Sequence, residues 1–228
     1  MSGALLEVFI TPAMAVKHDD ILVAAQAAGA VVRTATEGVI EALAQTVTPQ
    51  GIVGVCRFID VPIDQTLRTG TSLVALLANV RDPGNAGTVI RTADAAGADS
   101  VVLAGESVDP YNAKCVRASV GSIFHVPISV GVPVVDSIQR AKAAGLTVLG
   151  ADGGGDLDLD GAIDAGVLTR PTAWVFGNEA WGLTDDVLAA CDHVLAVPIH
   201  GKAESLNLAT AAAVCLYASA REQRRARG

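Results

Sequence analysis

The first segment of this sequence whose residue types could do chemistry is residues 79–94, which contains Asn85 and Arg91. We expect Asn85 near the N-cap of a helix over 86–96, where its side chain satisfies a free backbone N–H or faces a ligand. Arg91 lies within that helix among apolar residues, and a guanidinium is costly to bury without partners. A phosphate or a carboxylate is therefore expected close to Arg91. A purely structural arginine explains the same sequence pattern: its guanidinium is paired in the core, or its aliphatic stem lies along the core while the charge stays in water.

Two later segments also combine glycine with polar side chains. Glu179 lies two residues after Gly177, behind an expected strand, and glycine permits a ligand to approach the backbone closely. Ser205 and Asn207 stand at the start of the expected C-terminal helix, where backbone N–H groups are free. An ordinary loop with a helix-capping acid explains Glu179 without a ligand, whereas capping explains only one of the two later residues easily.

Strands and helices alternate along the chain, and this predicts an α/β fold with a mainly parallel sheet. The apolar run over 72–78 is typical of a central strand covered on both faces. Each polar segment follows an expected strand, so the three should meet at the carboxyl edge of the sheet, where open α/β sheets bind ligands. We expect strands over 7–10, 30–33, 52–56, 72–78, 100–103, 147–149, 173–176 and 193–197, and helices over 19–28, 36–44, 86–96, 112–120, 134–144 and 206–222.

The 228 residues suffice for one large domain or two smaller ones. Residues 60–71 are polar and contain Pro62 and Gly70, which predicts a linker. We therefore expect a small N-terminal α/β module over residues 1–68 and a larger domain over 72–228.

The composition excludes several classes of protein. With 51% hydrophobic and 18% charged residues, the chain buries a core and is not disordered. No apolar run is long enough to span a bilayer, the N-terminus lacks the basic region of a signal peptide, and four widely spaced cysteines suit a reducing cytosol. The net charge of −8 is unlike that of most nucleic-acid binders, so RNA binding would depend on local patches. The arginines at 221–227 form one such patch, and a solubilising helix end explains them equally well.

Motifs for other chemistries are missing. The chain has neither a Gly-x-Gly-x-x-Gly nucleotide motif nor a P-loop, and its four histidines show no metal-binding spacing. Residues 156–161 resemble the opening of a calcium loop, but Val167 stands where the bidentate glutamate is needed, which favours a solvated acidic loop. We expect no metal site.

In order and spacing, the three polar segments closely resemble the three motifs of the SpoU/TrmH family, the SPOUT-class RNA ribose 2′-O-methyltransferases. The resemblance covers residues 72–222. It implies a SPOUT fold whose C-terminal segment forms a deep trefoil knot, a rare exception to the rule against threaded chains. It also implies a homodimer with the active site at the subunit interface, and S-adenosylmethionine as the cofactor, held in the knot.

The resemblance assigns roles to individual residues. Arg91 matches the residue that acts on the 2′-hydroxyl. Because a guanidinium stays protonated, we expect it to stabilise the developing alkoxide and to contact the neighbouring phosphate. Asn85, Ser205 and Asn207 are expected to orient the ribose or Arg91, and Glu179 to fix its loop or to contact the substrate. The backbone is expected to hold the cofactor at four positions: Gly177, Val197, Ile199 and Leu206.

The N-terminal module resembles the RNA substrate-binding module of the family, which is similar to domains of some ribosomal proteins. It lacks a strand and a helix that members usually carry before the strand at Glu7, so we expect a truncated module or a start upstream. The two-module layout favours rRNA, 23S rRNA above all, over tRNA, and a cytoplasmic enzyme without membrane contact. Three alternatives stay open: a tRNA methyltransferase, a non-catalytic RNA-binding protein on the same fold, and an enzyme acting on a small metabolite.

Overall fold

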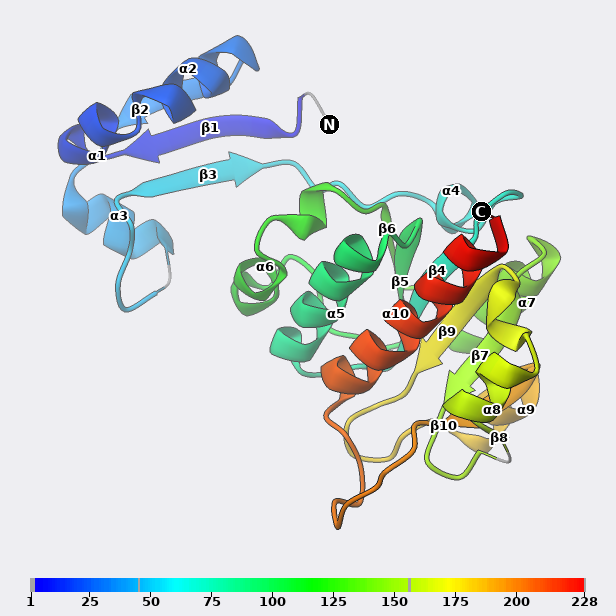
Figure 1. Ribbon diagram of the computed structural model, residues 1–228. Coiled ribbons are helices and arrows are strands. Elements are labelled where there is room, and N and C mark those ends of the chain that lie inside the picture. Colours follow the sequence, from blue (N-terminus) through cyan, green and yellow to red (C-terminus); the bar gives the residue numbers. More distant parts are fainter. Residues whose placement is uncertain (1–2, 45, 156, 228) are drawn as a thin grey trace. The chain divides into compact units, whose positions relative to one another are not determined.

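The computed structural model describes residues 3–44, 46–155 and 157–227, and the chain divides into two compact units, Met1–Ile59 and Asp60–Gly228 (Figure 1). The division falls at Ile59 rather than at the expected 68, and residues 60–71 are not a linker. They contain the short helix α4 (Ile63–Thr66). Ile63 and Leu67 belong to the core of the second unit because their spacing places both on one side of a helical turn.

The first unit is a three-stranded sheet with helices. Its strand order is β2-β1-β3, in which β1 pairs parallel with β2 and antiparallel with β3. Val8, Ile10, Ala25 and Ala30 form its core. The expected strands and helices are present, and a further helix, α1, begins after Thr11, whose hydroxyl accepts a hydrogen bond from the N–H group of Met14. The elements are β1 (Leu5–Ile10), α1 (Pro12–Lys17), α2 (Asp19–Ala27), β2 (Val31–Thr34), α3 (Glu37–Ala44) and β3 (Ile52–Cys56).

The second unit has a seven-stranded sheet in the order β6-β5-β4-β9-β7-β10-β8, and every pairing between its named strands is parallel. This confirms the α/β fold with a mainly parallel sheet. The two short strands at the edges, β6 and β8, were not expected from the sequence. The strands are β4 (Leu73–Ala78), β5 (Ser100–Ala104), β6 (Ile128–Val130), β7 (Thr147–Ala151), β8 (Leu157–Asp158), β9 (Thr172–Phe176) and β10 (His193–Ala196).

Helices cover both faces of this sheet. On one face, alternate residues of β4 such as Val74 and Leu76 pack in a core with α7 and α9. On the other face, α10 packs on β4 and β9 and lies beside α5, which packs on α6 (Figure 1). This explains why β4 is apolar at every position. The helices are α5 (Pro83–Ala96), α6 (Ala113–Ser119), α7 (Val134–Ala143), α8 (Leu159–Asp164), α9 (Asp185–Ala190) and α10 (Leu208–Arg227), with 3₁₀ helices η1 (Ser122–Phe124) and η2 (Val167–Thr169).

The basic end of α10 is partly used to hold the fold. Arg224 donates from Nη2 to the carbonyl of Ala96 at the end of α5, at 2.8 Å. Gln223 is buried and donates to the carbonyls of Ser72 and Arg170. Within the described part of the chain, no helix is both long and apolar enough to cross a membrane.

Ser219→Ala is expected to lower the free energy of unfolding by about 1–3 kcal/mol, because a buried donor loses its acceptor. Trp174 Nε1 donates to Ser219 Oγ at 2.8 Å, and both side chains are fully buried between β9 and α10. Urea unfolding followed by circular dichroism measures the change. In a Trp174→Phe background the same substitution should cost less, since the donor is already gone; an equal cost in both backgrounds would show that the hydrogen bond contributes nothing.

Candidate active site

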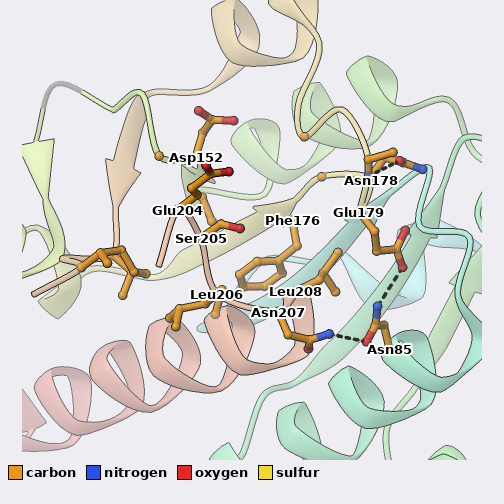
Figure 2. A pocket seen from close by; sticks show the side chains of 18 of the residues that line it. Asn85, Asp152, Phe176, Asn178, Glu179, Glu204, Ser205, Leu206, Asn207 and Leu208 are labelled. Atoms are coloured by element: carbon orange, nitrogen blue, oxygen red, sulfur yellow. Dashed lines mark hydrogen bonds between the residues drawn. The ribbon is translucent and has the colours of Figure 1, made fainter. Parts of the chain in front are cut away.

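A cavity of about 520 Å³ opens where several strands of the second unit end. This volume lies within the range of about 300–1,000 Å³ typical of small-molecule sites. Its walls come from the residues that follow β7, β9 and β10, from the first residues of α10 and from the start of α5 (Figure 2). The expectation that the three polar segments meet at the carboxyl edge of the sheet is thus met. All the expected site residues except Arg91 line the cavity: Asn85, Gly177, Glu179, Val197, Ile199, Ser205, Leu206 and Asn207.

Glu179 joins the loop after β9 to the start of α5. Its carboxylate accepts hydrogen bonds from the backbone N–H groups of Arg81 at 3.2 Å and Asp82 at 3.1 Å. It also accepts one from Asn85 Nδ2 at 3.1 Å. Of the two roles expected for Glu179, the fixing of its loop is the one for which the structure supplies contacts.

Asn85 is the third residue of α5, near the N-cap as expected, but it does not cap the helix. Asp82 caps the helix instead: its side chain accepts from the N–H group of Asn85 at 2.8 Å, and Pro83 occupies the first helical position. The side chain of Asn85 is therefore free of capping. It lies between Glu179 and Asn207, donating to the first and accepting at 3.1 Å from Nδ2 of the second (Figure 2).

Asn207 and Ser205 differ in what they do. Asn207 Oδ1 accepts hydrogen bonds from the N–H groups of Ala209 at 2.9 Å and Thr210 at 3.4 Å, so it caps α10. Its amide nitrogen reaches Asn85, which makes Glu179, Asn85 and Asn207 one connected chain across the three segments. Ser205 is exposed, lines the cavity, and makes no side-chain hydrogen bond with any described residue.

Gly177 is required for a reason other than ligand approach. A Cβ at this position would lie 2.3 Å from the carbonyl carbon of Gly182, so the two ends of the turn could not come together. The backbones of Asn178 and Gly182 exchange two hydrogen bonds of 2.9 Å. Asn178, for which the sequence predicted no role, is buried and donates from Nδ2 to the carbonyl of Asn79 at 2.7 Å.

Arg91 lies outside the cavity, and the expectation that it is buried among apolar side chains is wrong. It is exposed on α5 and makes no hydrogen bond or ion pair with the residues that the structure describes. The buried residues of α5 are Ala86, Gly87, Val89, Ile90, Ala93 and Ala96, and Arg91 falls off that stripe. Within one chain, the guanidinium and the cavity are separate features.

The cavity offers apolar walls, free backbone groups and negative charge. Phe176 and Leu195 contribute the apolar side, and between 199 and 206 the backbone makes no hydrogen bond with other described backbone groups. Asp152 and Glu204, which no motif had indicated, lie at the side of the cavity opposite Asn85 (Figure 2). This set of groups suits a ligand with an apolar ring that needs hydrogen bonds at its edge and with a positive charge elsewhere.

The carboxylate of Glu179 is ionised at neutral pH. Burial is the largest single influence and raises the pKa of Glu179. Hydrogen bonds from Asn85 and from backbone N–H groups, including those of Arg81 and Asp82, together lower the pKa by more than burial raises it. The pKa of Glu179 therefore lies below the ordinary carboxyl value. The stabilisation from this anion is therefore complete above the ordinary pKa and is lost as the pH falls through the lowered one.

Glu179→Gln is expected to leave one of the three donors without an acceptor and to loosen the loop after β9. The difference in thermal midpoint between wild type and Glu179→Gln should be constant at pH values above the ordinary carboxyl pKa. It should narrow as the pH falls through the lowered pKa of Glu179, where the wild-type carboxylate takes up a proton. Calorimetry across this range measures it. A gap that widens at acidic pH would mean that the carboxylate is not the acceptor that holds the loop.

Other candidate ligand sites are weaker. Among the described residues, no group of three or more His, Cys, Asp or Glu side chains is arranged to hold a metal ion. In the acidic segment 156–161, Asp156 lies outside the described residues, and Asp158 caps α8 by accepting from the N–H group of Gly161 at 2.7 Å.

Comparison with known proteins agrees with the sequence resemblance. A model of the SpoU rRNA Methylase family matches residues 72–217. The chain is 38% identical over 182 residues, which are 80% of this chain and 69% of the relative, to the 23S rRNA (guanosine(2553)-2′-O)-methyltransferase RlmP of Bacillus subtilis. It is 40% identical over 147 residues to the 23S rRNA (uridine(2479)-2′-O)-methyltransferase of Streptomyces viridochromogenes, covering 62% of this chain and 50% of that protein.

Solved structures show the same architecture in both units. The AdoMet-bound rRNA methyltransferase of Sinorhizobium meliloti has a TM-score of 0.79 at 32% identity, covering 96% of this chain and 80% of that one. The SpoU methyltransferase AviRb of Streptomyces viridochromogenes in complex with the cofactor AdoMet has a TM-score of 0.80 at 28% identity, covering 100% of this chain and 86% of that one. With its family match and these relatives, this chain belongs to the SpoU rRNA methylase family.

Proposed function

We propose that this protein transfers a methyl group from S-adenosylmethionine to a ribose 2′-hydroxyl of 23S rRNA. One observation carries the proposal: in a chain of the SpoU family, the three polar segments meet at a single cavity and are joined there by Glu179, Asn85 and Asn207. The relatives named for 23S rRNA support the choice of RNA.

The cavity fits S-adenosylmethionine in its chemistry. When bound, the cofactor supplies a methyl group on a sulfonium, which is already activated for transfer. The backbone groups of Gly177, Val197, Ile199 and Leu206 would hold the adenosine and methionine parts. The carboxylates that line the cavity favour a cationic ligand over a neutral one, since opposite charges attract.

The remaining work for the protein is to place the hydroxyl and to handle its proton. Asn85 and Asn207 would orient the ribose, because both amides lie at the cavity and are fixed by hydrogen bonds. A cation is needed where the alkoxide develops and where the neighbouring phosphate lies, and Arg91 is the side chain that we assign to this role. Ser205, exposed at the cavity wall, would contact the substrate.

The site is completed, in this proposal, by a second copy of the chain. Arg91 is exposed on α5, outside the cavity of its own chain. The elements that pack against α5 carry exposed apolar side chains, namely Val120 at the end of α6, Phe124 on η1, and Val214 and Tyr217 on α10. A homodimer through this face would cover these side chains and bring Arg91 of one copy to the cavity of the other.

Subunit complementation tests the shared site. Arg91→Ala keeps the cavity, and Leu206→Trp fills it while keeping the arginine. Each variant alone should be inactive. Mixing the two after dissociation should restore about a quarter of the wild-type activity, the share of intact sites when copies re-pair at random. Inactivity of the mixture, with hybrids demonstrated, would place Arg91 and the cavity of one site in the same chain.

Three finer features are also part of the proposal. The first unit, residues 1–59, would bind the RNA, as the layout of the family implies. The C-terminal segment would form the trefoil knot; in support, β10 pairs outside β7 whereas the α10 that follows it packs on β4 and β9. The cytoplasm, where rRNA is modified, would be the location.

Incubation with methyl-labelled S-adenosylmethionine and either unmodified 23S rRNA or tRNA tests the function and the choice of RNA. We expect label in 23S rRNA and none in tRNA. Label in tRNA alone would make the protein a tRNA methyltransferase. Cofactor and RNA binding without label in either RNA would favour a non-catalytic RNA-binding protein, and label in a small molecule without RNA would favour a metabolite enzyme.

A further inference from the structure

Trp181 is exposed beside the cavity although its side chain is large, aromatic and mostly apolar. Its exposed fraction is 56%, whereas the other tryptophan, Trp174, is fully buried. Trp181 lines a second, shallow recess together with Arg81, Glu179 and Asn207. Burial of an indole contributes strongly to stability, so an indole left in water at a cavity mouth is more readily explained by a ligand than by the fold.

The turn that carries Trp181 is held rigidly. Asn178 and Gly182 close it with two backbone hydrogen bonds of 2.9 Å, and Asn178 Oδ1 accepts from the N–H group of Ala180 at 2.8 Å. The carboxylate of Glu179 anchors the same turn to α5. The indole is therefore presented on a fixed support. Among the described residues, no aromatic ring stacks on it and no group hydrogen-bonds its Nε1.

The recess and the cavity share an edge. Asn85, Glu179 and Asn207 line both of them. If the reacting ribose lies at this shared edge, as the proposed function requires, the base attached to it or to the next nucleotide extends into the recess. Arg81, whose side chain is half exposed and paired with Glu106, adds a cation at the same place.

We propose that Trp181 is a substrate-binding residue whose indole stacks on a nucleobase of the RNA beside the methylated ribose. Unpaired bases of RNA are commonly recognised by stacking on aromatic side chains. A hydrophobic small molecule would not need the amides and the cation at the rim. A nucleotide uses all three kinds of group: the aromatic ring, the amides and the cation. The inference rests on the proposed function and adds to it a residue for which the family motifs assign no role here.

Steady-state kinetics with a 23S rRNA fragment test the inference. Trp181→Ala is expected to raise the KM for RNA by about 5- to 150-fold, the range that corresponds to the loss of one stacked base. The affinity for S-adenosylmethionine should stay unchanged. Trp181→Phe should recover most of the affinity for RNA, whereas Trp181→Leu, apolar but without a π face, should not.

Fluorescence supplies a readout that a merely structural role would not move. Because Trp174 is buried, quenching by added RNA reports on Trp181. We expect quenching by the RNA fragment and none by S-adenosylmethionine alone. If wild type transfers the methyl group and Trp181→Ala has the same KM for RNA, the inference is overturned and the proposed function is left intact. If wild type transfers no methyl group to RNA, both are overturned.

A second copy of the chain is the competing occupant of the recess. In that case the fluorescence of Trp181 in the protein without RNA is blue-shifted relative to an indole in water. Trp181→Ala then shifts the monomer–dimer equilibrium measured by sedimentation. Either observation, together with an absence of quenching by RNA, would overturn the proposal.

Discussion

Arg91→Ala is expected to lower the rate of methyl transfer by about 10²- to 10³-fold, the usual cost of removing a donor that stabilises developing negative charge. The affinity for S-adenosylmethionine should change by less than about twofold, because Arg91 is assigned to the ribose hydroxyl and the neighbouring phosphate rather than to the cofactor. Single-turnover kinetics with saturating RNA, together with cofactor binding by calorimetry, measure the two effects separately.

Two variants sharpen this test. Arg170→Ala removes an exposed arginine away from the cavity and should keep wild-type rates, which controls for the loss of one positive charge. Arg91→Lys keeps the charge but loses the planar fork, so it should recover only part of the rate. Loss of cofactor binding in Arg91→Ala would contradict the role assigned to Arg91.

Gly177→Ala is expected to destabilise the protein by about 1–3 kcal/mol or more and to weaken cofactor binding at least about tenfold. The added Cβ would lie 2.3 Å from one backbone atom of Gly182 and 2.5 Å from another, and backbone atoms cannot rotate away as a flexible side chain can. The turn between Asn178 and Gly182 must open, and the cavity wall moves with it. Thermal unfolding and calorimetric titration with S-adenosylmethionine measure the two losses.

Gly153→Ala is the matched control. Gly153 also lines the cavity, but a Cβ there meets no atom within 4 Å. Its thermal midpoint should stay within about 2 °C of wild type, as for a substitution that creates no clash. Equal destabilisation by the two variants would mean that the close approach of Gly177 to Gly182 is not what makes glycine necessary.

The fold could be predicted from the sequence where apolar patterns were long. The fully apolar β4 and the alternation of strands with helices were sufficient for a parallel α/β sheet. Short elements were missed because two or three residues carry too little pattern, as in β8 and β6. The prediction of a linker over 60–71 was wrong for a different reason. Ile63 and Leu67 have helical spacing, but a single helical turn is too short to be recognised among polar neighbours.

Apart from Arg91, the residues expected at the site line the cavity, but their local contacts could not be predicted. Asn85 was expected near an N-cap, where it caps the helix or faces a ligand, but the adjacent pair Asp82 and Pro83 carries the stronger signal for the start of a helix. Arg91 was taken as buried because its neighbours are apolar, yet a step of one residue along a helix turns it away from the buried stripe. Contacts such as Glu179 with the start of α5 join residues far apart in sequence, and no local pattern encodes them.

The most direct test of methyl transfer to a ribose is the chemical position of the methyl group. After incubation of 23S rRNA with methyl-labelled S-adenosylmethionine and this protein, complete digestion to nucleosides and mass spectrometry separate methylated riboses from methylated bases. We predict a single 2′-O-methylated nucleoside that is absent when Arg91→Ala replaces wild type. Label on a base, or label that does not depend on Arg91, would contradict the proposed function.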